Sequence, residues 1–220
     1  MSKWVAERKI VLDAARQAAE MGLVVGTAGN FSVRLGENGG RGLLAITPTT
    51  RYYDTLTVDD IVLVDFDGKR VEGELTPSVE VMMHLGIYKA RRKVNAVCHI
   101  HPIFASVFAV TGQEIPPIID DQITYLGGHI KVARYAISGT HELVENVLSA
   151  LGPNNAAILA HHGAVCCGRD MREAVTNCEM LEKTARIYLY ALSAGEVTPF
   201  PEDAFELEKA FFDYHHGESE

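Results

Sequence analysis

The spacing of apolar side chains predicts a helix at the start of the chain. Between residues 4 and 21 apolar positions recur every three or four residues, as they do on one face of a helix. Gly22 follows directly and is typical of a helix stop. Later segments with the same period predict further helices. These are residues 103–110, residues 140–148 with Thr140 as the cap, and a long helix after the cap Asp170, with Glu173 three residues on.

Short β-branched or apolar runs bounded by glycine, asparagine or aspartate predict strands between the helices. The predicted strands are residues 31–35, 43–47, 61–66, 94–98, 129–135 and 156–160. The close spacing of the first three favours an antiparallel sheet. The Gly- and Asn-containing segment 36–40 predicts a turn, and the Asp-Gly pair at 67–68 predicts a hairpin.

Thr76 and Pro77 have the pattern of an N-cap followed by proline at the first helical position. This pattern predicts a helix that runs from there to Arg92 and places Glu80 in its first turn. A carboxylate in a first turn is often only a partner of the helix dipole. Taken alone, Glu80 is therefore a weak catalytic candidate.

The composition and charge of the chain limit the kinds of molecule that the protein is expected to bind. The 220 residues are 47% apolar, which is enough for one domain with a sizeable core, expected to span residues 1–220. A formal charge of −9 leaves no basic field to hold nucleic acid or an anionic membrane. The chain lacks an apolar run of membrane-spanning length and an apolar signal segment at its start, so we expect a cytoplasmic protein. The four cysteines form no Cys-x-x-Cys pair and are expected to be buried thiols.

Two histidines follow the predicted strand 94–98, in the sequence His99-Ile100-His101. Side chains at positions i and i+2 of a strand share a face, so the two imidazoles would point the same way. This arrangement suits two ligands of one metal ion. The alternative is a pair of partly exposed histidines that bond to water or backbone.

A second pair, His161 and His162, ends the predicted strand 156–160. Because neighbours on a strand face opposite ways, one of the two is expected to join His99 and His101. Three histidines with an open fourth position are the ligand set of a catalytic divalent metal, zinc by first preference. The other histidines are expected to be structural (His84, His129 and His141) or solvated in the tail (His215 and His216).

Two loops offer groups that suit an anion. In Gly26-Thr27-Ala28-Gly29-Asn30 the glycines let the backbone approach a ligand, and Thr27 and Asn30 supply short polar side chains. Residues 48–53 contain hydroxyl groups and one cation, Arg51. An ordinary turn and an ordinary surface loop are the alternatives.

The ordered motifs of the chain resemble the class II aldolase/adducin family, particularly its L-fuculose-1-phosphate aldolase branch, over nearly the whole length. The motifs are Gly26-Thr27-Ala28-Gly29-Asn30-Phe31-Ser32, Ile46-Thr47-Pro48-Thr49, Pro77-Ser78-Val79-Glu80, His99-Ile100-His101 and His161-His162-Gly163. The resemblance implies a three-layer α/β/α sandwich with a central, mostly antiparallel sheet. It also implies a homotetramer with active sites near the subunit boundaries.

The resemblance assigns roles to several residues. His99, His101 and His162 match zinc ligands, with Mn²⁺ or another divalent metal as the alternative, and Glu80 matches a catalytic carboxylate. The implied activity is retro-aldol cleavage of a ketose or ketose 1-phosphate through a metal-stabilised enediolate. Residues that match the binding site for the substrate's phosphate are Thr27, Asn30 and Ser78, with Thr50 in the same pocket.

Some positions depart from the aldolase pattern. Thr50 stands where a glycine is expected, and Val79 stands where a serine is expected, which removes a donor to the phosphate unless Arg51 turns inward. Asp121 stands at the place of a proton-donating tyrosine, and Tyr214 falls near the place of a second tyrosine. The other activities implied by the family are sugar-phosphate 4-epimerase, dehydratase and decarboxylase. A non-catalytic, adducin-like domain would lack the histidines and the glutamate that this chain retains.

Overall fold

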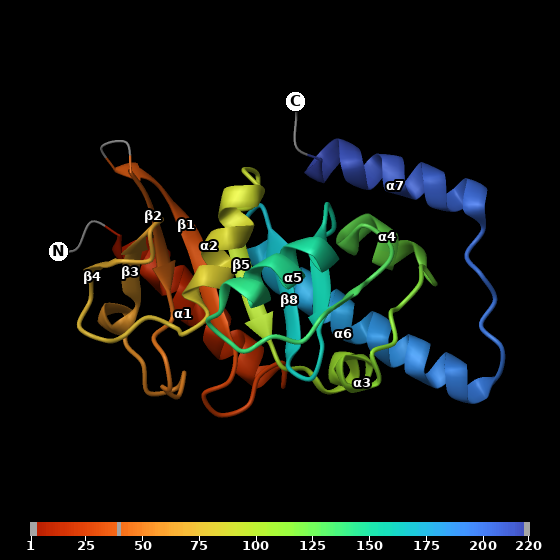
Figure 1. Cartoon of the computed structure of the whole chain (residues 1–220), viewed down its shortest axis with the longest axis horizontal. Helices are drawn as coiled ribbons and strands as arrows, with labels where there is room; N and C mark the ends of the chain where they lie inside the picture. The colour runs from red at the N-terminus through yellow and green to blue at the C-terminus, as the bar shows by residue number, and fades with distance from the viewer. Residues whose placement is uncertain (1–3, 39–40, 218–220) are drawn as a thin grey trace.

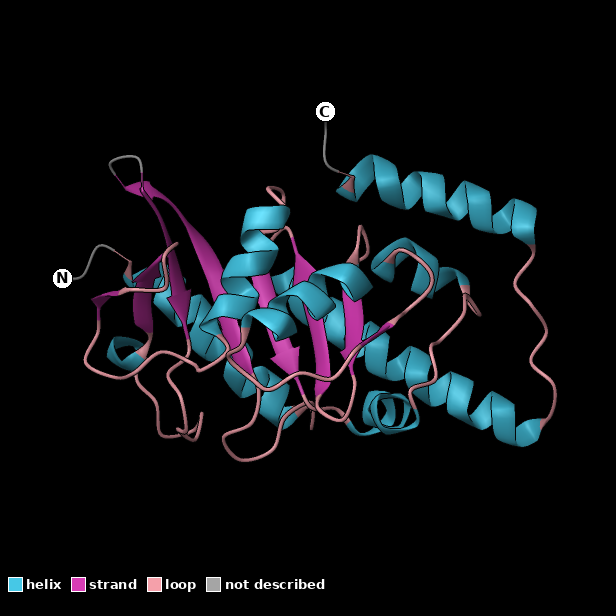
Figure 2. Cartoon of the chain, in the orientation of Figure 1, coloured by secondary structure: helices cyan, strands magenta, loops and turns pink. Residues whose placement is uncertain are grey.

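The computed structural model describes residues 4–38 and 41–217, which form one twisted sheet covered by helices on both faces (Figures 1 and 2). The described residues contribute eight strands to the sheet, in the order β4-β3-β2-β1-β5-β8-β7-β6. Neighbouring strands are antiparallel except β6 and β7, which are parallel. The structure therefore confirms the predicted α/β sandwich with a mostly antiparallel sheet.

The elements follow one another along the chain with short connections. The strands are β1 (Asn30–Asn38), β2 (Arg41–Ile46), β3 (Val62–Asp65), β4 (Arg70–Glu72), β5 (Ala96–Ile100), β6 (Val132–Ala133), β7 (Ala156–Leu159) and β8 (Gly163–Gly168). The helices are α1 (Val5–Glu20), η1 (Val58–Asp60), α2 (Val81–Ala90), α3 (Ile103–Thr111), α4 (Asp120–Leu126), α5 (His141–Leu151), α6 (Met171–Ala194) and α7 (Glu202–His216).

Two apolar cores lie on the two faces of the sheet. Helices α1, α3 and α6 cover one face, where they bury residues such as Phe31 and Cys98. Helices α2 and α5 cover the other face, over Val97 and Val165. Since successive residues of a strand point to opposite faces, the central strand β5 feeds both cores and is buried along its whole length. A strand that is buried on both faces holds the residues at its end in fixed positions.

The predicted start of α2 is wrong. The helix begins at Val81, so Glu80 occupies the N-cap position and not the first turn. Pro77 forms a β-bridge with Pro48, and the Ser78 N–H donates to the carbonyl oxygen of Thr47 at 3.1 Å. These contacts hold the segment before Glu80 against the loop that follows β2 and keep it out of the helix.

Other predicted boundaries also differ. Strand β1 continues through Gly36 to Asn38, where a turn was expected, and residues 39–40 of that turn lie outside the described residues. The predicted strand 129–135 is reduced to the two residues of β6. Strand β8 and helix α7 were not predicted. The prediction of buried thiols is confirmed, since all four cysteines are buried and free. Among the described residues no helix has the length and apolar character that a membrane span requires.

Candidate active site

Three imidazoles lie close together where the end of β5 is next to the turn between β7 and β8. His99 is in β5, His101 follows it, and His162 lies in the turn. Their ring centroids are 4.6 to 5.0 Å apart, and the Nε2 atoms of His99 and His101 lie 2.9 Å from each other. One nitrogen from each ring lies within 4.8 Å of the others. The three rings are therefore close enough to share one metal ion.

Local backbone geometry selects His162 over His161. Both residues lie in the turn after β7, where His161 adopts a left-handed conformation with φ 54° and its ring packs near Tyr135. Gly163 then starts β8 so close to β5 that a Cβ atom would lie 2.4 Å from the carbonyl oxygen of Ile100. The two histidines were expected to end a strand, but they lie in a turn, and the turn determines which of them joins the cluster.

The protonation states of the histidines suit a metal site. The Nδ1 of His99 donates to the carbonyl oxygen of Ala164 at 3.0 Å, which leaves the lone pair of Nε2 directed at the cluster. Burial lowers the pKa of His99 to about 3 and also lowers the pKa of His101. Neutral imidazoles with a free lone pair are the form in which histidine binds a metal, so the donor set fits a divalent ion.

Glu80 faces the same cluster. Its carboxylate is buried, with Oε2 at 3.2 Å from the Nε2 of His99 and Oε1 at 3.4 Å from the Nε2 of His162. Burial opposes ionisation, but the hydrogen bond that the Asn30 amide donates helps to hold the pKa of Glu80 below its ordinary value. An ionised carboxylate beside a metal site can accept a proton from a bound substrate.

A further contact to Glu80 comes from Ser138, in the loop between β6 and α5. Its hydroxyl group donates to Oε1 at 3.2 Å. Ser138 was not predicted to be at the site, because a single serine in a loop carries no periodic or motif signal. Only the return of this loop to the start of α2 brings it to the site.

The cluster opens into a pocket of about 210 Å³. The pocket contains the four residues that were predicted to bind substrate, which are Thr27, Asn30, Thr50 and Ser78. The loop with Thr27 packs tightly on β5, since a Cβ atom at Gly29 would lie 2.6 Å from the carbonyl oxygen of His99. Gly29 also has φ +76°, so this position requires glycine on two counts. Val79 lines the pocket too, with 61% of its surface exposed.

The structure does not bring every candidate into this pocket. Asp121 forms an ion pair with Lys183 on α6 at 2.6 Å, and Tyr214 is 83% exposed on α7. Arg51 lines a neighbouring depression with Glu74. His216 was expected to be solvated, and that prediction is wrong, because its side chain is 11% exposed and its Nε2 lies 2.9 Å from Oε1 of Glu173.

Thr50 adopts a left-handed backbone with φ 51°. This conformation costs a β-branched residue about 1–2 kcal/mol, and glycine avoids that cost. Glycine also raises the entropy of the unfolded chain, which favours unfolding by about 0.4–1 kcal/mol. We therefore expect Thr50→Gly to keep or raise the free energy of unfolding, by up to about 1.5 kcal/mol in denaturant titrations. The control Thr49→Gly, at a position without positive φ, should lower it by roughly 0.5–1 kcal/mol. Equal losses in both variants would contradict a left-handed Thr50.

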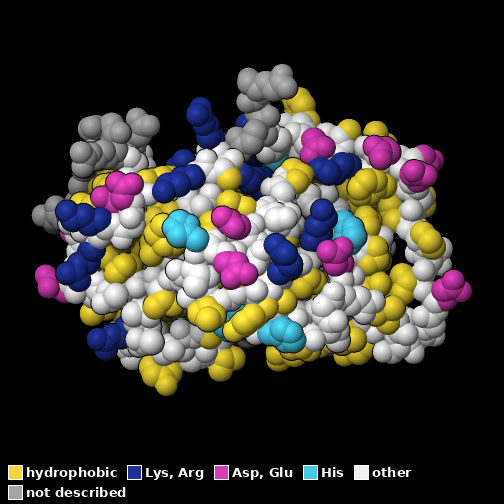
Figure 3. All heavy atoms as spheres, in the orientation of Figure 1, with side chains coloured by type: hydrophobic (Ala, Val, Ile, Leu, Met, Phe, Trp, Pro, Cys, Tyr) yellow, Lys and Arg dark blue, Asp and Glu magenta, His cyan; other side chains and the backbone are white. Residues whose placement is uncertain are grey.

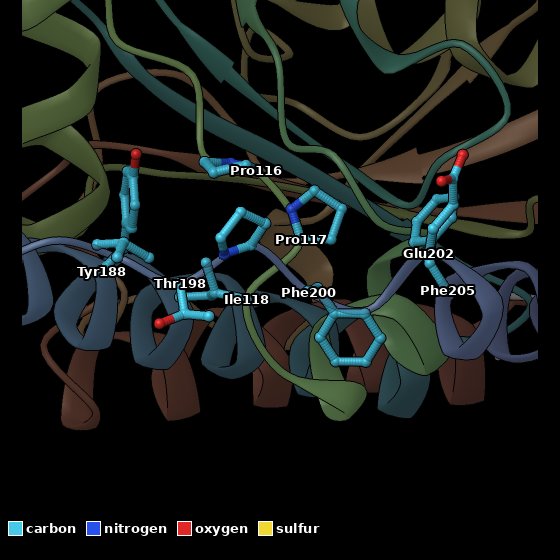
Figure 4. Close-up of a pocket in the computed structure, with 10 residues that line it drawn as sticks. Pro116, Pro117, Ile118, Tyr188, Thr198, Phe200, Glu202 and Phe205 are labelled. Carbon is cyan, nitrogen blue, oxygen red and sulfur yellow. The ribbon is translucent and has the colours of Figure 1, made fainter.

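A second cavity, of about 360 Å³, lies between the α3–α4 connection, α6 and the segment leading into α7 (Figure 4). Prolines and aromatic side chains dominate its lining, and Glu202 is its one carboxylate. On the face of the molecule in Figure 3, acidic and basic side chains are interspersed and form no large field of one sign. Because the pocket beside Glu80 brings three imidazoles and a carboxylate together, it is a better candidate for the catalytic site than the second cavity.

The chain is similar to known proteins over most of its length. Residues 9–189 match the family described as Class II Aldolase and Adducin N-terminal domain. The chain is 34% identical to the 5-deoxy-D-ribulose 1-phosphate aldolase of Bacillus thuringiensis serovar kurstaki, over 94% of this chain and 96% of that protein. It is 32% identical to the L-ribulose-5-phosphate 4-epimerase UlaF of Salmonella paratyphi B, over 93% of each chain. A solved structure of an L-fuculose 1-phosphate aldolase superposes with a TM-score of 0.89 at 32% identity, and covers 97% of this chain and 98% of that one.

Proposed function

The chain belongs to the class II aldolase and adducin family, and from this premise we propose that it is a zinc-dependent aldolase that cleaves a ketose 1-phosphate by retro-aldol chemistry. One observation carries the proposal: three imidazoles converge on a pocket where the buried carboxylate of Glu80 lies 3.2 Å from His99. We further propose a single domain over residues 1–220, a homotetramer with sites near subunit boundaries, and a cytoplasmic location.

We assign the metal to His99, His101 and His162, with zinc as the first choice and manganese as the alternative. A bound divalent ion would supply a Lewis acid for the negative charge that develops on the substrate's carbonyl and hydroxyl oxygens. The hydrogen bond from His99 to Ala164 and the low pKa of His99 support this assignment.

We assign proton transfer to Glu80. In the cleavage direction a substrate hydroxyl group loses its proton as the carbon–carbon bond breaks, and the carbon next to the carbonyl gains one. Because the Glu80 carboxylate lies beside the three imidazoles and is ionised, it can accept the proton that the hydroxyl group loses and deliver it to this carbon. Asn30 donates to one of its oxygens and Ser138 to the other, and these two hydrogen bonds limit its rotation.

We assign the phosphate of the substrate to Thr27, Asn30, Thr50 and Ser78. A donor to a charged group contributes roughly 1.5–3 kcal/mol, so Thr27→Val is expected to raise KM for a phosphorylated substrate by about 10- to 150-fold with little change in kcat. Arg51→Ala should leave KM near that of the wild type, because Arg51 lines the neighbouring depression. Inorganic phosphate should inhibit competitively. Equal turnover of phosphorylated and unphosphorylated ketoses, without inhibition by phosphate, would contradict this assignment.

The similarity to a 4-epimerase makes epimerisation the second candidate function. A screen of ketose phosphates with zinc or manganese separates the two by their products. Cleavage yields an aldehyde that a carbonyl reagent traps, whereas epimerisation yields an isomer of unchanged mass. If the metal-loaded protein does neither to any ketose phosphate, the proposed function is wrong.

A further inference from the structure

A buried row of hydrogen bonds runs from Glu80 into the core between β1 and α2. The Nδ2 of Asn30 donates to Oε2 of Glu80 at 2.7 Å, and the Oδ1 of Asn30 lies 2.6 Å from Nε2 of His84. On its other side, Nδ1 of His84 lies 2.6 Å from Oγ of Ser32, which lies 2.8 Å from the hydroxyl group of Tyr88. Each of the five side chains is at most 5% exposed.

The spacing of these residues explains why they meet. Glu80, His84 and Tyr88 are four residues apart, so they follow one face at the start and along the length of α2. Asn30 and Ser32 are two residues apart on β1 and share a face of the sheet. The row therefore links two elements on which the proposed pocket depends.

The donors and acceptors in the row can be assigned in only one direction. The Glu80 carboxylate can only accept, so the amide nitrogen of Asn30 faces it and the amide oxygen faces His84. That oxygen can only accept, so Nε2 of His84 carries the ring proton. Burial lowers the pKa of His84 to about 4, so the ring is neutral and its Nδ1 accepts from the hydroxyl group of Ser32.

The row is poorly suited to carry protons between Glu80 and the core. An amide separates Glu80 from His84, and amides neither take up nor release protons in the ordinary pH range. What the row can do is fix orientation. If the Asn30 amide turned by 180°, its oxygen would face the carboxylate oxygen of Glu80 at the present 2.7 Å separation, and two acceptors would repel each other.

We propose that His84 is a positioning residue, which holds the Asn30 amide with its nitrogen towards Glu80 and thereby fixes the carboxylate at the three imidazoles. Ser32 and Tyr88 in turn hold the ring of His84 in place. The effect on turnover rests on the proposed function of Glu80. The hydrogen-bond direction does not, and it can be measured separately.

The direction is tested by nuclear magnetic resonance on the wild-type protein with ¹⁵N-labelled histidine, and the signal of His84 is assigned by its loss in His84→Gln. The expected result is a neutral ring at pH 7 with its proton on Nε2. A proton on Nδ1, or a doubly protonated ring, would overturn the proposal whether or not the protein is an aldolase.

The effect on catalysis is tested with two amides. In His84→Gln the side-chain amide can reach the place of Nε2 and donate to Asn30, whereas the shorter amide of His84→Asn reaches only the place of Nδ1. We expect His84→Gln to retain kcat within about threefold and His84→Asn to lose about tenfold to hundredfold, with metal content unchanged in both. Equal kcat in the two folded variants, or a loss that follows the melting temperature alone, would overturn the proposal. If no ketose phosphate reacts, the proposed function fails and the tautomer measurement still decides the orientation of His84.

Discussion

Glu80→Gln is expected to lower turnover by about 10²–10⁴-fold while the divalent metal stays bound. Glutamine keeps the shape of the side chain but cannot take up the proton that the proposed reaction moves. The carboxylate is buried and its oxygens lie 3.2 and 3.4 Å from the nitrogens of His99 and His162, so water cannot easily replace it. The measurement is kcat at saturating substrate, with metal content determined on the same sample.

A matched control is Glu173→Gln. Glu173 is also partly buried and bonds to an imidazole, that of His216, but it lies at the start of α6 outside the pocket. Its replacement should lower the melting temperature and leave kcat within about twofold, because it removes structural contacts and no reacting group. If Glu80→Gln turned over substrate as fast as the wild type, Glu80 would be only an N-terminal residue of α2.

The sequence pattern predicted the structural features that depend on residues close together in the chain. The face of α1, the caps Thr140 and Asp170, and the strand that leads into His99 all follow from periodicity and capping chemistry within a few residues. The strand ends predicted that His99, His101 and one of His161 and His162 would lie close together, and the resemblance to a family assigned His162. These parts required no knowledge of distant contacts.

Long-range contacts decided the parts that the sequence analysis missed. Thr76 and Pro77 look like a helix start, but the pairing of Pro77 with Pro48 overrides that local signal. Strand β8 consists of glycines, alanine, valine and two cysteines, of which only valine is typical of strands, and pairing with β5 and β7 makes this segment a strand. A single histidine in the sequence does not indicate which side chains it contacts. The contacts of His84 with Asn30 and Ser32 could be found only from the structure.

The wild-type protein is expected to hold one divalent metal ion per chain, and His101→Ala is expected to lose it together with the lyase activity. Removal of one of three ligands leaves two nitrogens, and we expect the affinity for zinc to fall by more than about 100-fold. His161→Asn is the control, because His161 lies outside the cluster and asparagine tolerates its left-handed backbone. That variant should keep its metal. Metal analysis after dialysis without chelators decides the assignment. Full occupancy in His101→Ala, or no stoichiometric metal in the wild type, would contradict it, since either result means that the three imidazoles do not share an ion.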